Sequence, residues 1–348
     1  AGYTNGVSKL HGQVCRKMWK PLWPELNEDD VPINSITNGV HVPTWIAPQF
    51  NFLFKKYIAE DWIARQDDLS IWENMSKIPD EAIWDIHRWL KLKLIGAILD
   101  RARKRWSQTN CDPIQPLAMG ALLDSEALTI GFCRRFTGYK RPTLIFRNME
   151  RLNKIMTRDL QPIQFVFAGK AHPNDEDGKR LIQQVYNLAK DPRFGGRIAF
   201  VEDYDMHLAR DLVRGVDVWL NTPRFLMEAS GTSGQKASLN GVLNLSVLDG
   251  WWFEGYNGDN GWGIQEKENV NLSEQDDQTS SAIYDLLENK IIPLYYDVDA
   301  AGIPLGWVKM MKETMRSNTP FFNTSRMAKE YAERFYVKVL STANGKKH

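Results

Sequence analysis

The sequence predicts an α/β protein whose core is a doubly wound parallel sheet with flanking helices. Two observations lead to this fold class. Between residues 127 and 234, short apolar runs alternate with segments whose apolar residues recur at helical spacing, a pattern typical of βαβ units and therefore of a parallel sheet. Each apolar run is followed by polar, basic or glycine-rich residues, and ligands of such sheets bind where the strands end.

Strands are expected where apolar and β-branched residues concentrate, at residues 127–133, 165–169, 198–201 and 216–220. Helices are expected between and after them, at residues 142–156, 175–189 and 206–214 and from the glycine- and serine-rich turn at 230–234 onward.

Outside this region the sequence predicts helices and loops. Helical spacing of apolar residues predicts helices over 7–18 and 80–106, and the prolines of residues 21–50 predict loop with at most short strands. The polar stretch 266–280 is expected to be a surface loop, with two closing helices near residues 280–290 and 323–340.

The composition excludes several classes of partner. Lys+Arg number 44 and Asp+Glu 43, for a net charge of +1, so no nucleic-acid partner is expected. No apolar run is long enough for a membrane span. Cys15, Cys111 and Cys133 form no paired framework, which favours a reducing, cytoplasmic location. The histidines have no metal-ligand spacing, so no metal site is expected.

A basic cluster follows the first predicted strand. Residues 134–141 read R-R-F-T-G-Y-K-R, with Arg134, Arg135, Lys140 and Arg141 among them. Cations at the carboxyl end of a strand are suited to binding phosphate. The alternative is a solvated loop whose charges form salt bridges.

Two further loops have similar character. Residues 228–236 read E-A-S-G-T-S-G-Q-K and follow the fourth predicted strand. Its small residues allow a ligand to approach the backbone, and Lys236 is a candidate for a Schiff base or a phosphate contact. Gly169-Lys170-Ala171 follows the second predicted strand. Each could be only a turn before a helix, but three such loops at one sheet edge predict a site for a phosphate-bearing ligand.

These motifs together resemble those of the α-glucan (glycogen, starch and maltodextrin) phosphorylases. Residues 228–236, followed by L-N-G at 239–241 and L-D-G at 248–250, resemble the family's cofactor motif E-A-S-G-T-G-N-M-K. Residues 134–141 resemble its K-R-x-x-x-Y-K-R. The segments at 5–11, 37–39 and 169–171 resemble three further motifs, and the order is kept from residue 5 to about 255. The tryptophan-rich segment 251–262 is closer to the short, unregulated branch.

The resemblance implies a role for each matching residue. Lys236 would form the Schiff base with pyridoxal 5′-phosphate. The other cofactor-binding residues would be Gly231, Thr232, Ser233, Arg134, Lys170 and Tyr204. The substrate phosphate would be bound by Arg135 and Lys140 and lined by Tyr139, and the glucosyl unit by Glu228, Ser230, Gly231 and Asn38. The catalytic set implied is Arg135, Lys140, Glu228 and Lys236.

The implied activity is reversible phosphorolysis of an α-1,4-glucan, with inorganic phosphate, to glucose 1-phosphate with retained configuration. The implied fold is the Rossmann-like lobe of a two-lobe, glycosyltransferase B-type enzyme. The chain resembles the C-terminal lobe of that enzyme. The expected divisions are the end of an N-terminal lobe or an inter-lobe segment (1–47), a helical connecting region (48–115), the α/β cofactor lobe (116–270) and C-terminal helices (271–348).

The partners implied are a homodimer mate or a separate N-terminal lobe. By itself the chain is expected to bind the cofactor but to phosphorolyse glucan poorly or not at all. Several positions depart from the family pattern, namely Arg134 for Lys, Ser233 for Gly, Gly234-Gln235 for Asn-Met and Asp205 for Arg. Two alternatives remain open: a retaining glucosyltransferase lobe that uses a nucleotide sugar, against which Lys236 argues, and a truncated lobe that binds anions or the cofactor without catalysis.

Overall fold

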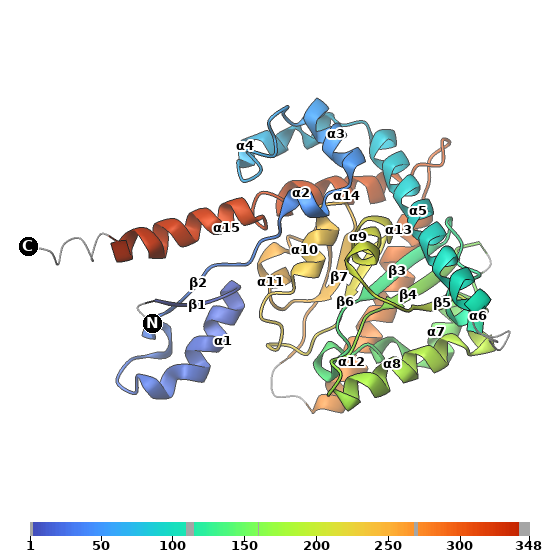
Figure 1. Cartoon of the computed structure of the whole chain (residues 1–348), viewed down its shortest axis with the longest axis horizontal. Helices are drawn as coiled ribbons and strands as arrows, with labels where there is room; N and C mark the ends of the chain where they lie inside the picture. Colours follow the sequence, from blue (N-terminus) through green and yellow to red (C-terminus); the bar gives the residue numbers. More distant parts are fainter. Residues whose placement is uncertain (1–2, 109–114, 159, 268–270, 341–348) are drawn as a thin grey trace, which may run out of the picture.

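A six-stranded, all-parallel sheet forms the centre of the protein (Figure 1). The computed structural model describes residues 3–108, 115–158, 160–267 and 271–340. The strand order is β5-β4-β3-β6-β7-β8. The strands are β3 (Leu128–Cys133), β4 (Ile163–Ala168), β5 (Ile198–Val201), β6 (Val218–Asn221), β7 (Leu243–Val247) and β8 (Gly261–Ile264). Every residue of β3 to β7 is buried, so packing on both faces stabilises the sheet.

The sheet is doubly wound, as the sequence predicts. From β3 the chain proceeds outward through β4 to β5, then returns to place β6 on the other side of β3. The strand order therefore reverses between β3 and β6, and ligands of such sheets bind in the crevice at that point, outside the carboxyl ends of the strands.

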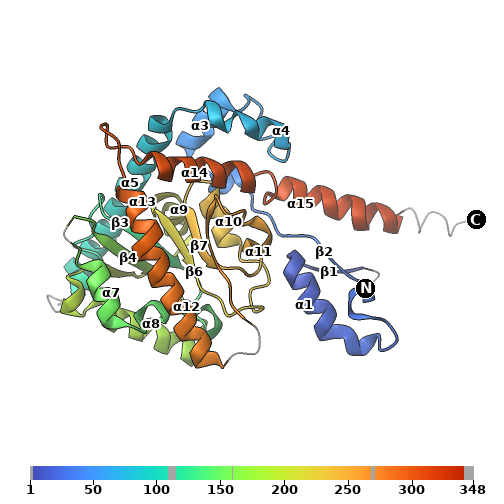
Figure 2. The same cartoon turned by 180° about the vertical axis from the view of Figure 1, so that it is seen from behind.

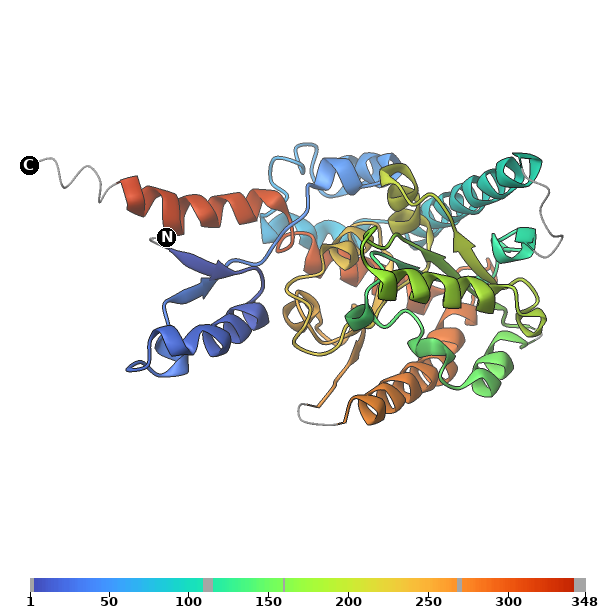
Figure 3. The same cartoon turned by 60° about the horizontal axis from the view of Figure 1, so that its bottom comes forward.

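Helices cover both faces of the sheet (Figure 3). One layer contains α7 (Met149–Met156), α8 (Glu176–Ala189) and α12 (Leu272–Leu286). The opposite layer contains α5 (Asp80–Gln108), α9 (Met206–Gly215), α10 (Thr232–Ser238) and α14 (Leu305–Asn318). Side chains cap several of these helices, because Asn148, Asp175 and Asp205 each accept a hydrogen bond from a backbone N–H of the first turn.

The N-terminal segment forms a small unit beside the sheet. It consists of β1 (Thr4–Gly6), α1 (Lys9–Trp19) and β2 (Ile33–Ser35), and β1 pairs with β2 in parallel. In Figures 1 and 2 this unit lies below α15 (Thr324–Tyr331), which extends away from the body. Arg334, three residues beyond the end of α15, donates to the carbonyl of Ser35 at 2.9 Å and so joins this unit to the segment that follows α15.

The remaining helices are short. They are α2 (Val42–Trp45), α3 (Pro48–Tyr57), α4 (Leu69–Trp72), α6 (Gln115–Ala118), α11 (Trp252–Gly255) and α13 (Ile292–Tyr296). Buried residues of α3, α5, the sheet and α14 belong to one continuous apolar core. The four-part domain division stays a prediction. Within the described residues, no helix is both long and apolar enough to span a lipid bilayer.

The structure confirms the four predicted strands and corrects several other expectations. The loop predicted at 266–280 is wrong, because α12 begins at Leu272, where Asn271 caps it. The helix predicted from residue 142 begins only at Met149, after a 3-10 turn and the Asn148 cap. The strands β7 and β8 and the helix α14 were not predicted.

Candidate active site

The candidate site lies where the strand order reverses. Arg134 directly follows β3, and its guanidinium donates to the side-chain oxygen of Asn221, the last residue of β6. The same guanidinium donates to the Ser233 hydroxyl on α10 at 3.2 Å. One side chain thus connects the ends of both central strands with the loop after β6.

Arg134 is buried and keeps one unused hydrogen-bond donor. Its side chain is only 7% exposed, and its Nε has no hydrogen-bond partner among the described residues. Burial lowers the pKa of this guanidinium, and the Glu228 carboxylate, 4.0 Å away, opposes that effect. A buried cation with an unused donor favours an anionic ligand, since the ligand would supply both the charge and the missing hydrogen bond.

Lys140 and Glu228 form a buried ion pair beside Arg134. Burial, together with the Arg134 charge, lowers the pKa of Lys140 to about 8, although Glu228 acts in the other direction. The site therefore holds the cations Arg134 and Lys140 and the Glu228 carboxylate away from water.

Asp249 fixes the position of Glu228, and the sequence analysis gave Asp249 no role. Its two carboxylate oxygens accept from the backbone N–H groups of Glu228 at 3.0 Å and Gly250 at 2.7 Å. Burial raises the pKa of Asp249 to about 6. The L-D-G motif was the available signal, because a buried aspartate between a strand and a turn commonly binds backbone N–H groups.

Two glycines allow the loops to approach one another. Gly231 has φ of +84°, a left-handed conformation, and an added Cβ would lie 3.2 Å from the Glu228 carboxyl. At Gly169 an added Cβ would lie 1.9 Å from the carbonyl oxygen of Arg134. Side chains at these positions would separate the loops that carry the charged groups.

Lys236 lies on α10, close to the same loops. Its amine is 3.9 Å from the ring centroid of Trp45, and no hydrogen bond or ion pair joins it to another described residue. Burial lowers the pKa of Lys236. A partly desolvated, unpaired amine is suited to bonding a carbonyl carbon.

The N-terminal motifs reach this site through backbone contacts. The Ser8 hydroxyl donates to the carbonyl of Ala229 at 2.7 Å, next to Glu228. The Gln235 amide donates to the carbonyl of Asn38 at 2.9 Å. The structure therefore places both the segment around residues 5–11 and the T-N-G segment against the 228–236 loop.

The other expected residues lie around this centre with different exposure. Ser230 is buried, and its hydroxyl has no hydrogen-bond partner in the part of the chain that the structure describes, whereas Thr232 and Tyr204 are half-buried. Tyr139 is half-buried as well, and burial raises the pKa of its phenol. The side chains of Arg135 and Lys170 are exposed, although the Lys170 carbonyl accepts from the Phe136 N–H at 3.0 Å.

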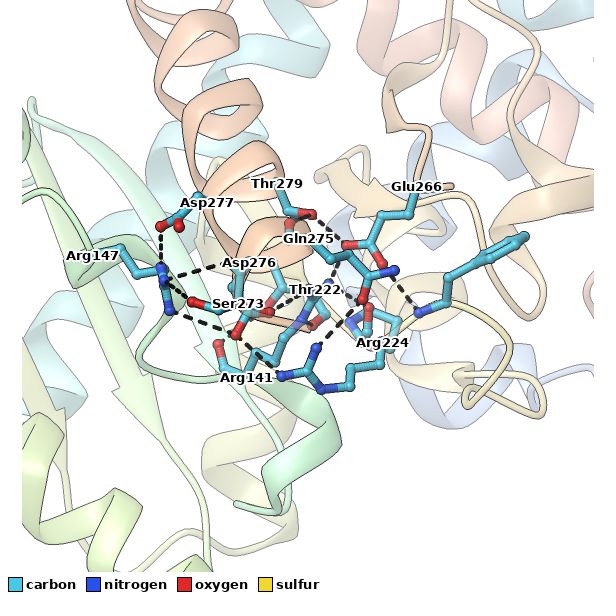
Figure 4. A network of polar contacts seen from close by, with 12 residues as sticks. Arg141, Arg147, Thr222, Arg224, Glu266, Ser273, Gln275, Asp276, Asp277 and Thr279 are labelled. Carbon is cyan, nitrogen blue, oxygen red and sulfur yellow. Dashed lines mark hydrogen bonds and ion pairs between the residues drawn. The ribbon is translucent and has the colours of Figure 1, made fainter. Parts of the chain in front are cut away.

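Arg141 ends the same basic cluster, but its guanidinium belongs to a separate ion-pair network (Figure 4). Its guanidinium pairs with Glu266 and, at 3.0 Å, with Asp276 on α12. It also donates to the carbonyl of Thr222, whose hydroxyl donates to the Lys140 carbonyl at 3.0 Å. The backbone of Arg141 is left-handed, with φ of 49°, so the network holds an uncommon conformation next to Lys140.

A family profile described as carbohydrate phosphorylase matches residues 1–258. The chain belongs to the carbohydrate phosphorylase family. It is 52% identical over 340 residues to a glycogen phosphorylase of Aquifex aeolicus, covering 98% of this chain and 48% of that protein. It is 44% identical to a maltodextrin phosphorylase of Thermococcus litoralis, covering 99% of this chain and 40% of that protein. The chain thus spans less than half the length of these relatives.

The geometry accounts for two departures from the family pattern. The Ser233 hydroxyl accepts from both Arg134 and, at 3.3 Å, the Trp219 indole. Asp205 caps α9 through the Leu208 N–H at 2.7 Å and pairs with Arg101 at 3.1 Å. Both side chains therefore have structural partners in this member of the family. Among the described residues, no three His, Cys, Asp or Glu side chains are grouped to hold a metal ion.

Anion affinity is expected to fall as the pH rises through about 8, where Lys140 loses its proton. Because the pKa of Lys140 is lowered to about 8, its amine is protonated well below this pH and loses its charge as the pH rises above it. Sulfate is the suitable probe because its charge is constant in this range, and Asp249 titrates lower, at about 6. Calorimetric titration should show affinity falling by up to about tenfold per pH unit above 8.

Lys140→Arg is the matched variant, since a guanidinium stays charged throughout this range. We expect its sulfate affinity to vary much less with pH. Equal pH dependence in the two proteins would contradict the assignment of the titration to Lys140.

Proposed function

We propose that this chain forms the cofactor- and phosphate-binding lobe of an α-glucan phosphorylase, which converts α-1,4-glucan and inorganic phosphate reversibly into glucose 1-phosphate with retention. The observation that carries the proposal is the combination of the unpaired Lys236 amine with the buried cations Arg134 and Lys140. A nucleotide-sugar transferase has no chemical need for this amine, and the similarity to glycogen and maltodextrin phosphorylases supports the same choice.

The residues present fit pyridoxal 5′-phosphate. Lys236 supplies an amine whose pKa is lowered by burial, as bonding to an aldehyde requires. The unpartnered Nε of Arg134 and the unpartnered hydroxyl of Ser230 are buried polar atoms that need ligands. By their match to the family motifs, we assign Gly231, Thr232 and Ser233 to the cofactor phosphate, with Arg134 nearby. We assign Tyr204 to the cofactor ring, and Lys170 is a further cofactor-binding residue.

The substrate residues follow from the same loops. Lys140, Arg135 and Tyr139 would bind the substrate phosphate, and Glu228, Ser230, Gly231 and Asn38 would bind the glucosyl unit. Glu228 is buried and held through its backbone by Asp249, so its carboxylate can accept sugar hydroxyls in a fixed orientation.

Charge explains why the site needs so many cations. When bound, the cofactor would supply a second phosphate group that acts beside the substrate phosphate as a proton donor or electrostatic partner. Two phosphate groups in contact repel strongly in a site of low dielectric constant. Arg134 and Lys140 would lower this repulsion, and they would also stabilise the negative charge that the phosphate carries while the glycosidic bond breaks.

The activity test compares glucose 1-phosphate release from glucan and phosphate in two preparations. One is this chain alone with pyridoxal phosphate. The other contains in addition the part of the Aquifex aeolicus glycogen phosphorylase that this chain does not match. We expect poor turnover by the chain alone, because it covers only 48% of the Aquifex aeolicus protein. We expect clear turnover by the combination.

Lys236→Ala in the combined preparation is the control and should remove turnover. Cofactor binding without turnover in every preparation would favour the non-catalytic alternative, whereas glucosyl transfer from a nucleotide sugar would overturn the proposal. Full activity of the chain alone would refute the need for the additional part. A homodimer and a cytoplasmic location stay predictions.

A further inference from the structure

The Lys236 amine lies on the face of an aromatic ring that the sequence analysis did not assign to the site. Trp45 ends the short helix α2, is 9% exposed, and has its ring centroid 3.9 Å from the Lys236 Nζ. An ammonium over an indole face is attracted by the ring quadrupole. Such a contact holds the side chain in place without giving the amine a hydrogen-bond acceptor or a carboxylate.

Asn240 ties Trp45 and Lys236 together through their backbones. Its side-chain amide donates to the Trp45 carbonyl at 3.1 Å and to the Lys236 carbonyl at 2.9 Å. Its oxygen accepts from the Ala47 N–H at 2.8 Å. Asn240 is fully buried and is the central residue of the L-N-G motif. The asparagine of this motif therefore joins the backbone of α2 to that of α10.

Arg214 on α9 also holds the backbone around Trp45. The Arg214 guanidinium donates to three consecutive carbonyls, those of Thr44 at 3.3 Å, Trp45 at 3.0 Å and Ile46 at 2.7 Å. A four-residue helix has few internal hydrogen bonds to define its position. The Asn240 and Arg214 contacts therefore determine where the indole ring lies.

We infer that Trp45 is a positioning residue for Lys236. Its indole face holds the amine at the cofactor site in a free, unpaired state. Asn240 fixes the position of the Trp45 backbone relative to the Lys236 backbone. The inference rests on the proposed function, in which Lys236 bonds to pyridoxal phosphate. It adds a residue of α2 to the set that prepares the cofactor site.

The chemistry of attachment explains why this arrangement is useful. The amine nitrogen bonds to the aldehyde carbon, the aldehyde oxygen leaves as water, and the amine must first lose its extra proton. A carboxylate partner would stabilise the protonated form strongly. The indole face stabilises it only modestly, while burial acts in the opposite direction and lowers the pKa of Lys236. Arg214 is the charged group on α9 that is bound to this segment.

The test measures how fast pyridoxal phosphate attaches to the protein as a function of pH. Samples are reduced with borohydride at intervals, and the attached cofactor is quantified by mass spectrometry in wild type, Trp45→Phe and Trp45→Leu. Loss of the indole removes stabilisation of the ammonium, so in Trp45→Leu the pH midpoint should fall by about half a unit, which is about threefold in the acid constant. The plateau rate at high pH should also fall, on the order of tenfold, because the amine is no longer held in place.

Trp45→Phe keeps a weaker aromatic face and should lie between wild type and Trp45→Leu. The control is Trp84→Leu, which removes a buried tryptophan that packs on His87 and Tyr295 instead and should leave the midpoint unchanged. A general loss of folded protein lowers the amount that reacts but does not move the midpoint, so folding and positioning are separated.

The outcomes are distinguishable. If wild type does not attach the cofactor at all, the proposed function fails. If wild type attaches it and the Trp45 variants show the same midpoint and plateau, the inference on Trp45 is overturned. If Trp45→Leu does not fold, the comparison of Trp45→Phe with wild type decides, since circular dichroism reports its folding independently.

Discussion

Replacing Lys236 with alanine is expected to abolish covalent incorporation of pyridoxal phosphate. The amine nitrogen is the atom of this side chain that can bond an aldehyde, and it lies over the Trp45 ring with no hydrogen bond or ion pair to another described residue. After incubation with the cofactor and reduction with borohydride, the wild-type mass should rise by one reduced cofactor per chain. The mass of the Lys236→Ala protein should not change, and its cofactor absorbance should be absent.

Two further variants sharpen this experiment. Lys236→Arg keeps a positive charge but lacks a primary amine, so it should also fail to attach the cofactor while retaining affinity for sulfate. Lys154→Ala removes an exposed lysine that pairs with Glu150 on the surface at 3.0 Å and should behave as wild type. Equal incorporation by wild type and Lys236→Ala would show that another lysine reacts, and it would remove the main support for the proposed function.

Replacing Asp217 with asparagine should give the largest loss of stability among the polar substitutions considered. Asp217 is fully buried beside β6, pairs with Lys91 at 2.6 Å and accepts from His87 at 2.7 Å and from the Thr129 N–H at 2.7 Å. Burial acts to raise the pKa of Asp217, but the Lys91 charge and the His87 hydrogen bond outweigh it, so the pKa is lowered. Its contribution to stability is therefore present above the unfolded pKa and is lost as the pH falls.

In Asp217→Asn the buried Lys91 would lose its counter-charge, which costs about 3–5 kcal/mol in such pairs. Urea unfolding followed by circular dichroism would measure the shift in midpoint. The control is Asp177→Asn on α8, which breaks an exposed pair with Arg180 and should cost less than about 1 kcal/mol. Equal shifts for the two variants would contradict the role of the Asp217 network.

Part of the fold is predictable because the local signal agrees with the tertiary environment. The strands β3 and β4 are continuous apolar runs, as strands buried on both faces should be. β7 lacks this signal, since Asn244 and Ser246 lie inside it and are buried. Asn244 donates to the carbonyl of Gly234 at 3.2 Å and to the Ser238 hydroxyl at 3.0 Å. The Asn244 side chain finds these hydrogen-bond partners because α10 packs on β7.

The error at residues 266–280 has a similar cause. A run of acidic and polar residues resembles a solvated loop, but in α12 the carboxylates of Asp276 and Asp277 face basic residues from other segments. Asp276 pairs with Arg141 at 3.0 Å and Arg224 at 3.1 Å, and Asp277 pairs with Arg147 at 2.7 Å (Figure 4). No local pattern reports such distant partners.

The candidate site was predictable in its chemistry but not in its connections. Arg134, Lys140, Glu228 and Lys236 carry the charges and the amine, and their motifs are visible in the sequence. Asn221, Asp249, Asn240 and Trp45 hold those groups in place. The L-N-G and L-D-G motifs mark Asn240 and Asp249 in the sequence, but which group each residue holds became apparent from the contacts.

By itself, the sequence determined the class of sheet, the motifs that identify the family and the residue types that can bind phosphate and an aldehyde. These properties depend on short-range periodicity and on side-chain chemistry. Only the tertiary structure decided which buried charges are paired, which polar atoms are left for a ligand and which ring lies under the lysine. Those outcomes depend on distances between segments that are up to about two hundred residues apart, such as Trp45 and Lys236, and on the exclusion of water between them, which strengthens every charge interaction there.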